Sequence, residues 1–115
     1  MSGEQRFDAV VVGAGQAGPF LGATFVARGM KVALIEERDL GGTCVNRGCT
    51  PTKTLRKSAR VAYMARRARE FGVETGPVQV NFKAAMERMQ RRVDEARSGL
   101  QAWLGQLEGL TIIKA

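Results

Sequence analysis

The chain has 115 residues, of which 44% are hydrophobic, and 18 Lys and Arg against 11 Asp and Glu give a formal net charge of +7. This length supports one domain with a modest core. No apolar run approaches the roughly 18 residues needed to span a bilayer, and the N-terminus lacks the pattern of a secretory signal. We therefore expect a cytoplasmic protein that binds no membrane. The basic excess raises nucleic acid as a partner, but the basic residues lie mainly on two helical patterns without exposed aromatics, so we expect solvated helix faces and no nucleic-acid ligand.

The chain opens with a βαβ pattern. Residues 7–12 are a β-branched run that ends at glycine, which predicts a buried parallel strand. The hexapeptide GAGQAG follows at 13–18, residues 19–29 carry apolar side chains at helical spacing, and residues 30–35 predict a second strand. Pro19 lacks an N–H near the first full helical bond, so we expect slight local distortion there. A glycine-rich hexapeptide alone is weak evidence, but between a strand and a helix it predicts a dinucleotide site.

Each glycine of this turn has an expected role. Gly13 makes the tight turn, Gly15 lets the backbone approach a pyrophosphate, and Gly18 lets helix and strand pack closely. The helix N-terminus carries partial positive charge toward the phosphates. Glu36, about twenty positions on, is placed to accept hydrogen bonds from a ribose. The alternative, an exposed acid that merely ends a strand, fits this register poorly.

Residues 41–55 contain both cysteines of the chain, Cys44 and Cys49. Positions i and i+5 of an α-helix lie about 8–9 Å apart at Cα, whereas a disulfide needs roughly 4.4–6.8 Å, so a bond between them requires a break in the helix, which Gly48 permits. On count alone, two buried inert thiols are the plainer interpretation. A metal site is disfavoured, because a closed zinc site takes four N/S ligands and the chain has no histidine. The helix onset at Pro51 and the nearby Lys53 favour activated thiols, and hence a redox pair.

The remaining pattern predicts two long helices and a third strand. Residues 51–71 form a helix with a basic outer face, residues 72–77 a loop, and Asn81 the N-cap of a helix that runs towards residue 107. Apolar residues recur along this second helix at steps of four and three, which predicts a core face or a seam against the neighbouring helix. Residues 110–113 predict the third strand. The pattern is that of an α/β chain with parallel strands.

Two motifs, GAGQAG at 13–18 and GGTCVNRGCTPTK at 41–53, resemble the N-terminal part of the flavoprotein disulfide reductases. This is the family of pyridine nucleotide-disulfide oxidoreductases, which includes dihydrolipoamide dehydrogenase, glutathione reductase and mercuric reductase. The resemblance covers essentially the whole chain. It implies a Rossmann-like three-layer FAD-binding domain, present in part over residues 1–115, with the NAD(P)H and dimerisation domains absent. The chain therefore looks like a fragment that alone should not complete turnover.

The resemblance also implies a cofactor and roles for individual residues. Glycines 13, 15 and 18 would hold the pyrophosphate of FAD, and Glu36 the ribose. Cys44 and Cys49 would form the catalytic redox disulfide, with Cys49 against the flavin and Cys44 meeting the substrate. Thr43 and Lys53 would be further contacts on the flavin side.

In this family, electrons would pass from NAD(P)H to FAD, then to the disulfide, and then to a small-molecule disulfide or a mercuric ion. Full-length relatives are homodimers. Arg47 departs from the family pattern, and it could lower a thiol pKa or simply point to solvent. The competing hypothesis is a non-catalytic module that binds FAD or ADP.

Overall fold

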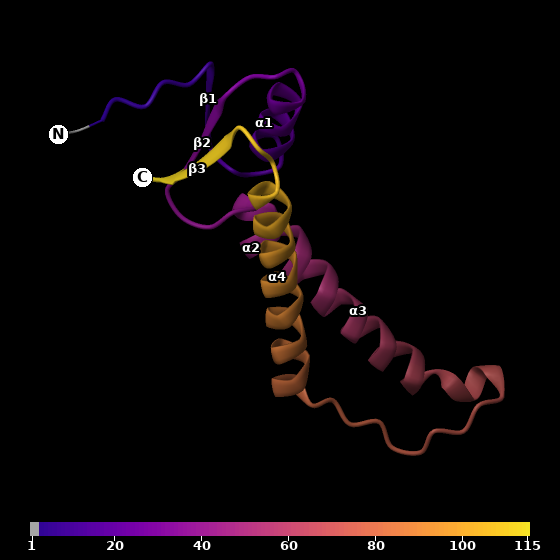
Figure 1. The fold of residues 1–115 in the computed structure, drawn as a ribbon. Helices are drawn as coiled ribbons and strands as arrows, with labels where there is room; N and C mark the ends of the chain where they lie inside the picture. Colours follow the sequence, from indigo (N-terminus) through magenta and orange to yellow (C-terminus); the bar gives the residue numbers. More distant parts are fainter. Residues whose placement is uncertain (1–2) are drawn as a thin grey trace.

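The computed structural model describes residues 3–115, which form a three-stranded parallel sheet and a long helical arm (Figure 1). The strands are β1 (Ala9–Val12), β2 (Val32–Glu36) and β3 (Leu110–Lys114), and they lie in the order β1-β2-β3. Both pairings are parallel, with Val11 opposite Leu34 and Leu34 opposite Ile112. The predicted α/β, Rossmann-like architecture with parallel strands and two long helices is confirmed.

The βαβ unit follows the predicted pattern closely. Helix α1 (Gly18–Ala27) connects β1 to β2, and Gly29, with φ +81°, ends it as expected. The slight distortion expected at Pro19 stays a prediction, and the N–H of Leu21 donates to the Ala17 carbonyl at 3.0 Å. Because the helix begins at Gly18, Pro19 falls in the first turn, where backbone N–H groups have no helical partner and proline costs nothing.

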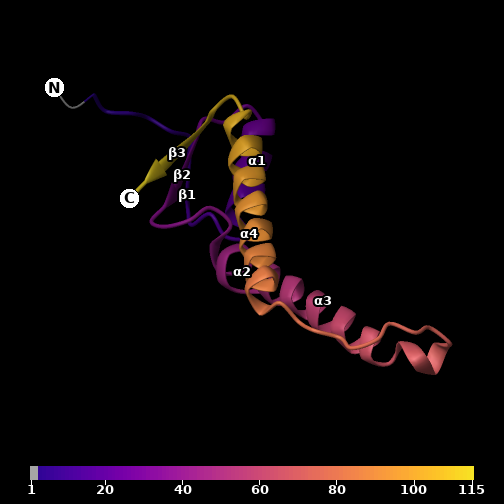
Figure 2. The same cartoon turned by 90° about the horizontal axis from the view of Figure 1, so that it is seen from below.

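The core lies between the sheet and two helices. Alternate strand residues Val11, Val32 and Leu34 are buried together with Leu104 of α4 (Phe82–Gly105). Figure 2 shows α1 and the C-terminal half of α4 on the same side of the sheet. The opposite face carries Val12, which is 81% exposed. The described residues thus supply a sheet and one helical layer of the expected partial domain.

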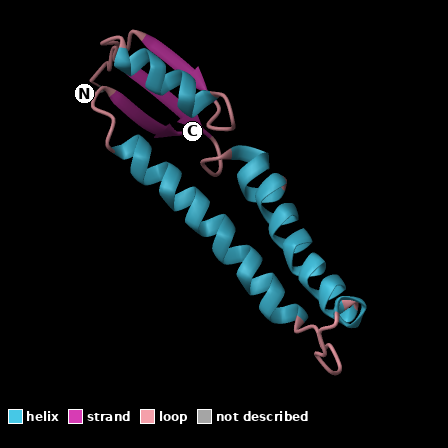
Figure 3. Cartoon of the chain, turned by 90° about the vertical axis from the view of Figure 1, so that its right-hand side faces the viewer, coloured by secondary structure: helices cyan, strands magenta, loops and turns pink. Residues whose placement is uncertain are grey.

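Two long helices extend away from the sheet (Figures 1 and 3). Helix α3 (Cys49–Arg66) begins two residues earlier than the pattern predicts and ends five residues sooner, because residues 68–71 form a separate 3-10 turn, η1 (Ala68–Phe71). Helix α4 begins as predicted, with the Asn81 side chain accepting a hydrogen bond from the N–H of Ala84 at 3.0 Å. Arg88 donates to the Thr54 carbonyl at 3.0 Å and so ties α4 to α3.

The apolar stripe of α4 is only partly core. Val93 and Leu104 are buried and Trp103 lies against Phe20 of α1, with ring centroids 5.4 Å apart. Phe82, at the far end of the stripe, is 69% exposed. The first half of α4 lies in the extended arm, away from the sheet. There Val93 is buried and Met86 and Met89 are half-buried where α4 packs on α3, so the predicted seam against the neighbouring helix is confirmed up to its far end. Across residues 3–115, helices that combine the length and apolar character needed for a membrane crossing are absent.

Candidate functional site

The glycine-rich turn between β1 and α1 has the geometry that its sequence predicts. Gly13 has φ +99°, a left-handed backbone that glycine adopts without cost. A Cβ built on Gly15 would meet no other atom of the described residues within 4 Å, so the space beside its Cα is open. A Cβ on Gly18 would instead collide with the Gly13 carbonyl and would lie 3.5 Å from the Leu34 side chain. The turn is therefore tight at its base and open at Gly15.

Glu36 ends β2 and fastens this turn. Its carboxylate accepts hydrogen bonds from the backbone N–H of Ala14 at 2.7 Å and of Arg38 at 2.9 Å. These two hydrogen bonds hold the pKa of the Glu36 carboxyl below its usual value, and the bond from Ala14 has the larger effect. Each carboxylate oxygen keeps a further lone pair, so the carboxylate can still accept hydrogen bonds from hydroxyl groups. The bond to Ala14, across 22 residues, was not expected from the sequence.

Replacing Glu36 with glutamine should reduce stability at neutral pH by about 1 kcal/mol, because charge-assisted hydrogen bonds to the turn are lost. A carboxylate whose folded pKa is depressed stabilises the protein above its unfolded pKa, and this contribution is lost as pH falls through the folded value. The difference between wild type and Glu36→Gln in urea unfolding should therefore shrink as the pH is lowered below about 4. The neighbouring exposed acid provides the control. Glu37→Gln should leave both the free energy of unfolding at neutral pH and its dependence on pH nearly unchanged. If the stability difference between wild type and Glu36→Gln stayed constant with pH, the ionised Glu36 carboxylate would not be what stabilises the turn.

The two cysteines lie at a break between helices. Cys44 is in α2 (Gly42–Arg47), Gly48 separates the helices, and Cys49 is the first residue of α3. The thiols form a disulfide, and their Cα atoms are 4.8 Å apart. The predicted departure from helical geometry at Gly48 is confirmed, and its reason is close approach: a Cβ there would lie 3.1 Å from the Thr43 carbonyl oxygen.

The start of α2 touches the glycine-rich turn. The N–H of Gly41 donates to the Ala14 carbonyl at 2.7 Å. A Cβ built on Gly42 would lie 2.8 Å from the Cα of Gly15, so only glycine fits here. The turn and the cysteine stretch, more than 25 residues apart in sequence, are therefore neighbours in space.

The other expected site residues lie near the disulfide. Thr43 precedes Cys44 in α2 and is exposed. Lys53 is also exposed and lies one helical turn beyond Cys49, so Cys49 and Lys53 share a face of α3. Cys49 is exposed and Cys44 half-buried. Lys53 also lines a surface groove of about 250 Å³ together with three further basic residues of α3, Arg56, Lys57 and Arg60.

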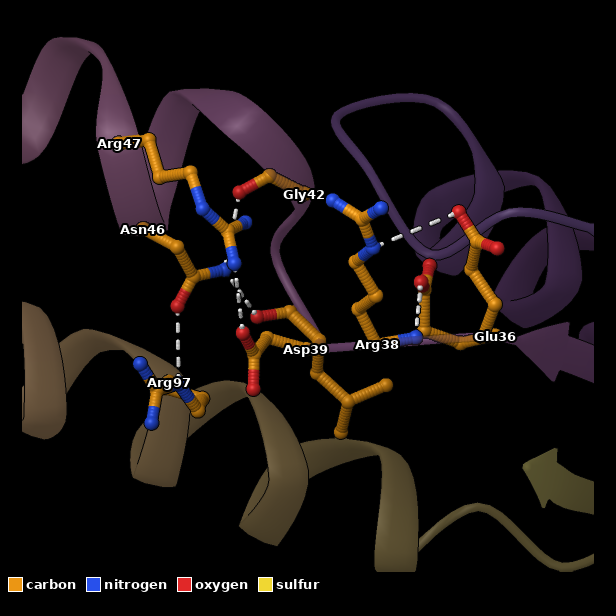
Figure 4. A network of polar contacts seen from close by, with 9 residues as sticks. Glu36, Arg38, Asp39, Gly42, Asn46, Arg47 and Arg97 are labelled. Carbon is orange, nitrogen blue, oxygen red and sulfur yellow. Dashed lines mark hydrogen bonds and ion pairs between the residues drawn. The ribbon is translucent and has the colours of Figure 1, made fainter. Parts of the chain in front are cut away.

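Polar side chains between the cysteines make contacts that sequence reasoning did not identify (Figure 4). Asn46 donates to the carbonyl oxygens of Leu40 at 3.0 Å and Gly42 at 2.9 Å, and accepts from Nε of Arg97 in α4 at 2.8 Å. Arg47 is exposed and bonds the Asp39 carboxylate at 3.3 Å. Of the two roles left open for Arg47, the solvent-facing one agrees with this placement.

Comparison with known proteins gives a consistent result. The family described as pyridine nucleotide-disulphide oxidoreductase matches residues 7–111. A dihydrolipoyl dehydrogenase of Chlamydia muridarum is 42% identical over 96 residues, which are 84% of this chain and 21% of that protein. One from Bacillus subtilis is 40% identical over 95 residues, 83% of this chain and 20% of the relative.

Among solved structures, the Cu(II) complex of the HOCl-induced flavoprotein disulfide reductase RclA from Escherichia coli is similar with a TM-score of 0.74 and 30% identity. The similarity covers 97% of this chain and 22% of the RclA chain. The chain thus spans about a fifth of the length of the relatives it matches.

Proposed function

Because the chain belongs to the pyridine nucleotide-disulphide oxidoreductase family, we propose that it is the FAD-binding and redox-disulfide segment of an NAD(P)H-dependent disulfide reductase. Residues 1–115 would then be part of an FAD-binding domain in a longer cytoplasmic, homodimeric enzyme. One observation carries the proposal: a disulfide at the break between α2 and α3 lies beside a glycine-rich turn with open space at Gly15.

The residues of the turn fit FAD. The open side of Gly15 gives a pyrophosphate room to approach the backbone, and Glu36 has free lone pairs for ribose hydroxyls. Gly13 and Gly18 would shape the turn, and Thr43 and Lys53 would contact the flavin side. When bound, FAD would supply hydride chemistry with NAD(P)H and pass two electrons to the protein disulfide.

The cysteines carry the second half of the reaction. Two electrons break the Cys44–Cys49 bond and leave two thiols once two protons are taken up. The N-terminus of α3 favours the thiolate of Cys49, its first residue. Cys44 attacks a substrate disulfide, which releases one substrate thiol and leaves a mixed disulfide. Cys49 then attacks Cys44, which re-forms the protein disulfide and releases the second thiol.

A small-molecule disulfide is the substrate class that we propose. A metal ion is the second candidate, and it has one observation in its favour: the similar RclA was solved as a Cu(II) complex. For a metal ion, the two electrons held by the dithiol would reduce one ion by two electrons, or two Cu(II) ions by one electron each, while the disulfide re-forms and two protons are released.

Titration of the purified chain with FAD, followed by mild reduction of the disulfide, tests the proposal. We expect bound flavin and a long-wavelength absorption band from the Cys49 thiolate beside it. Cys49→Ser should keep flavin binding and lose the band, whereas the matched Cys44→Ser should keep both. Bound flavin whose spectrum is indifferent to both substitutions would instead favour a non-catalytic FAD- or ADP-binding module, and failure to bind flavin would overturn the proposal.

A further inference from the structure

Asn46 lies between the two cysteines in sequence and uses its whole side-chain amide. Its NH₂ group donates to the carbonyls of Leu40 and Gly42, and its oxygen accepts from Arg97. The orientation of the amide is unambiguous, because backbone carbonyls only accept and a guanidinium only donates. We call these four residues, Leu40, Gly42, Asn46 and Arg97, the Asn46 network.

The Asn46 network joins three parts of the chain. Leu40 lies in the segment after β2, Gly42 and Asn46 belong to α2, and Arg97 comes from α4, 51 residues beyond Asn46. Figure 4 shows Asn46 between the α4 ribbon, from which Arg97 reaches it, and the start of α2 at Gly42. Both Asn46 and Arg97 are half-buried, so their bond is less screened than an exposed one.

Helix α2 needs such an anchor. It has only six residues, none of them buried, and glycine stands on each side of it. A helix this short is not stable by itself, because the cost of nucleation exceeds the gain from so few hydrogen bonds. The nearby Arg47–Asp39 pair is exposed, and such pairs contribute little. The position of Cys44 therefore depends on what holds α2 in place.

We propose that Asn46 and Arg97 are positioning residues that hold α2 against Cys49 and thereby set the reduction potential of the Cys44–Cys49 pair. This inference rests on the proposed redox role of the cysteines. In the disulfide form α2 stays tethered through Cys44 whether or not the network is present. In the dithiol form α2 without the network can leave its site and gain conformational entropy. Loss of the network therefore favours the dithiol.

The test is the equilibrium of the chain with a glutathione buffer, without FAD. Two glutathione thiols reduce the Cys44–Cys49 disulfide and become one glutathione disulfide, and the free thiols are trapped by alkylation and counted by mass. Arg97→Ala and Asn46→Ala should each shift the equilibrium about tenfold towards the dithiol, equivalent to about 30 mV for a two-electron couple. The double variant should shift it no further than the larger single change, since both residues act through the same network, which needs all of its bonds to hold α2.

Two further variants separate positioning from other effects. Asn46→Asp keeps a partner for Arg97 but removes both donors to the carbonyls of Leu40 and Gly42, so it should shift the equilibrium like Asn46→Ala. Arg92→Ala is the matched control and should behave as wild type. Arg92 is an exposed arginine of α4 whose one ion-pair partner within residues 3–115 is its own helix neighbour Glu95. A purely structural role would destabilise the disulfide and dithiol forms equally in urea unfolding and leave the equilibrium unmoved.

The outcomes decide between the two proposals. Equilibria of the Arg97 and Asn46 variants that match Arg92→Ala would overturn the positioning role, as would wild-type behaviour of Asn46→Asp. Neither result would contradict the proposed FAD binding, which is measured in a separate titration. A wild-type chain that forms no Cys44–Cys49 disulfide at any glutathione ratio would overturn both the positioning role and the proposed redox function.

Discussion

Replacement of Gly15 with valine is expected to abolish FAD binding while the chain keeps its fold. A Cβ at Gly15 meets no other atom within 4 Å among the described residues, and Gly15 does not have the positive φ seen at Gly13. The Cβ of the added side chain therefore enters open space, which we assign to the pyrophosphate. We expect the dissociation constant for FAD to rise at least roughly a hundredfold, since a clash of a few kcal/mol costs a factor of ten for each 1.4 kcal/mol or so.

Flavin fluorescence titration measures this loss, and circular dichroism with urea unfolding shows whether the fold survives. Gly3→Val is the matched control, because Gly3 also has open space around it but lies outside the turn. It should bind FAD as wild type does. Stoichiometric FAD binding by Gly15→Val at wild-type affinity would place the pyrophosphate elsewhere and refute the assignment of the turn.

Features that depend on local sequence were the ones that could be predicted. The strand, glycine turn and helix of the βαβ unit each follow from side-chain periodicity and from the special conformation of Gly13. The Asn81 cap is likewise local, as its side chain bonds an N–H three residues away. The break at Gly48 followed from the reach of a disulfide alone, and the structure confirms it.

Contacts between distant segments could not be predicted from one sequence. The bond from Ala14 to Glu36 exists because two βα segments meet at the carboxyl ends of adjacent strands, and periodicity carries no information about that meeting. The pairing of Asn46 with Arg97 spans 51 residues, and many other arginines of the helices were equally plausible partners. A short amide side chain between two cysteines was the one available signal, and it did not reveal the partner.

Periodicity did not show which part of the α4 stripe packs on the sheet, which part packs on α3, and where that packing ends. The apolar stripe of α4 continues to Phe82, yet only its C-terminal half contacts the sheet. A stripe records which face of a helix is apolar, and the extent of burial depends on how far neighbouring elements reach. Here α3 diverges from α4 towards the tip of the arm, so the far end of the stripe is left uncovered (Figure 1).

Replacement of Gly18 with alanine is expected to destabilise the chain by about 3 kcal/mol, even though alanine is the better helix former. The new Cβ collides with the carbonyl oxygen of Gly13, which is backbone in a turn that Glu36 and the start of α2 hold in place, so nothing nearby can move cheaply. Urea unfolding measures the loss.

Gly99→Ala in α4 is the control, because a Cβ there meets nothing within 4 Å and should stabilise the helix by up to about 1 kcal/mol. The same methyl group should thus have opposite effects in two helices. If Gly18→Ala also stabilised the chain, the close contact of α1 with the turn would be wrong. The turn would then lack the fixed geometry on which a pyrophosphate site beside Gly15 depends.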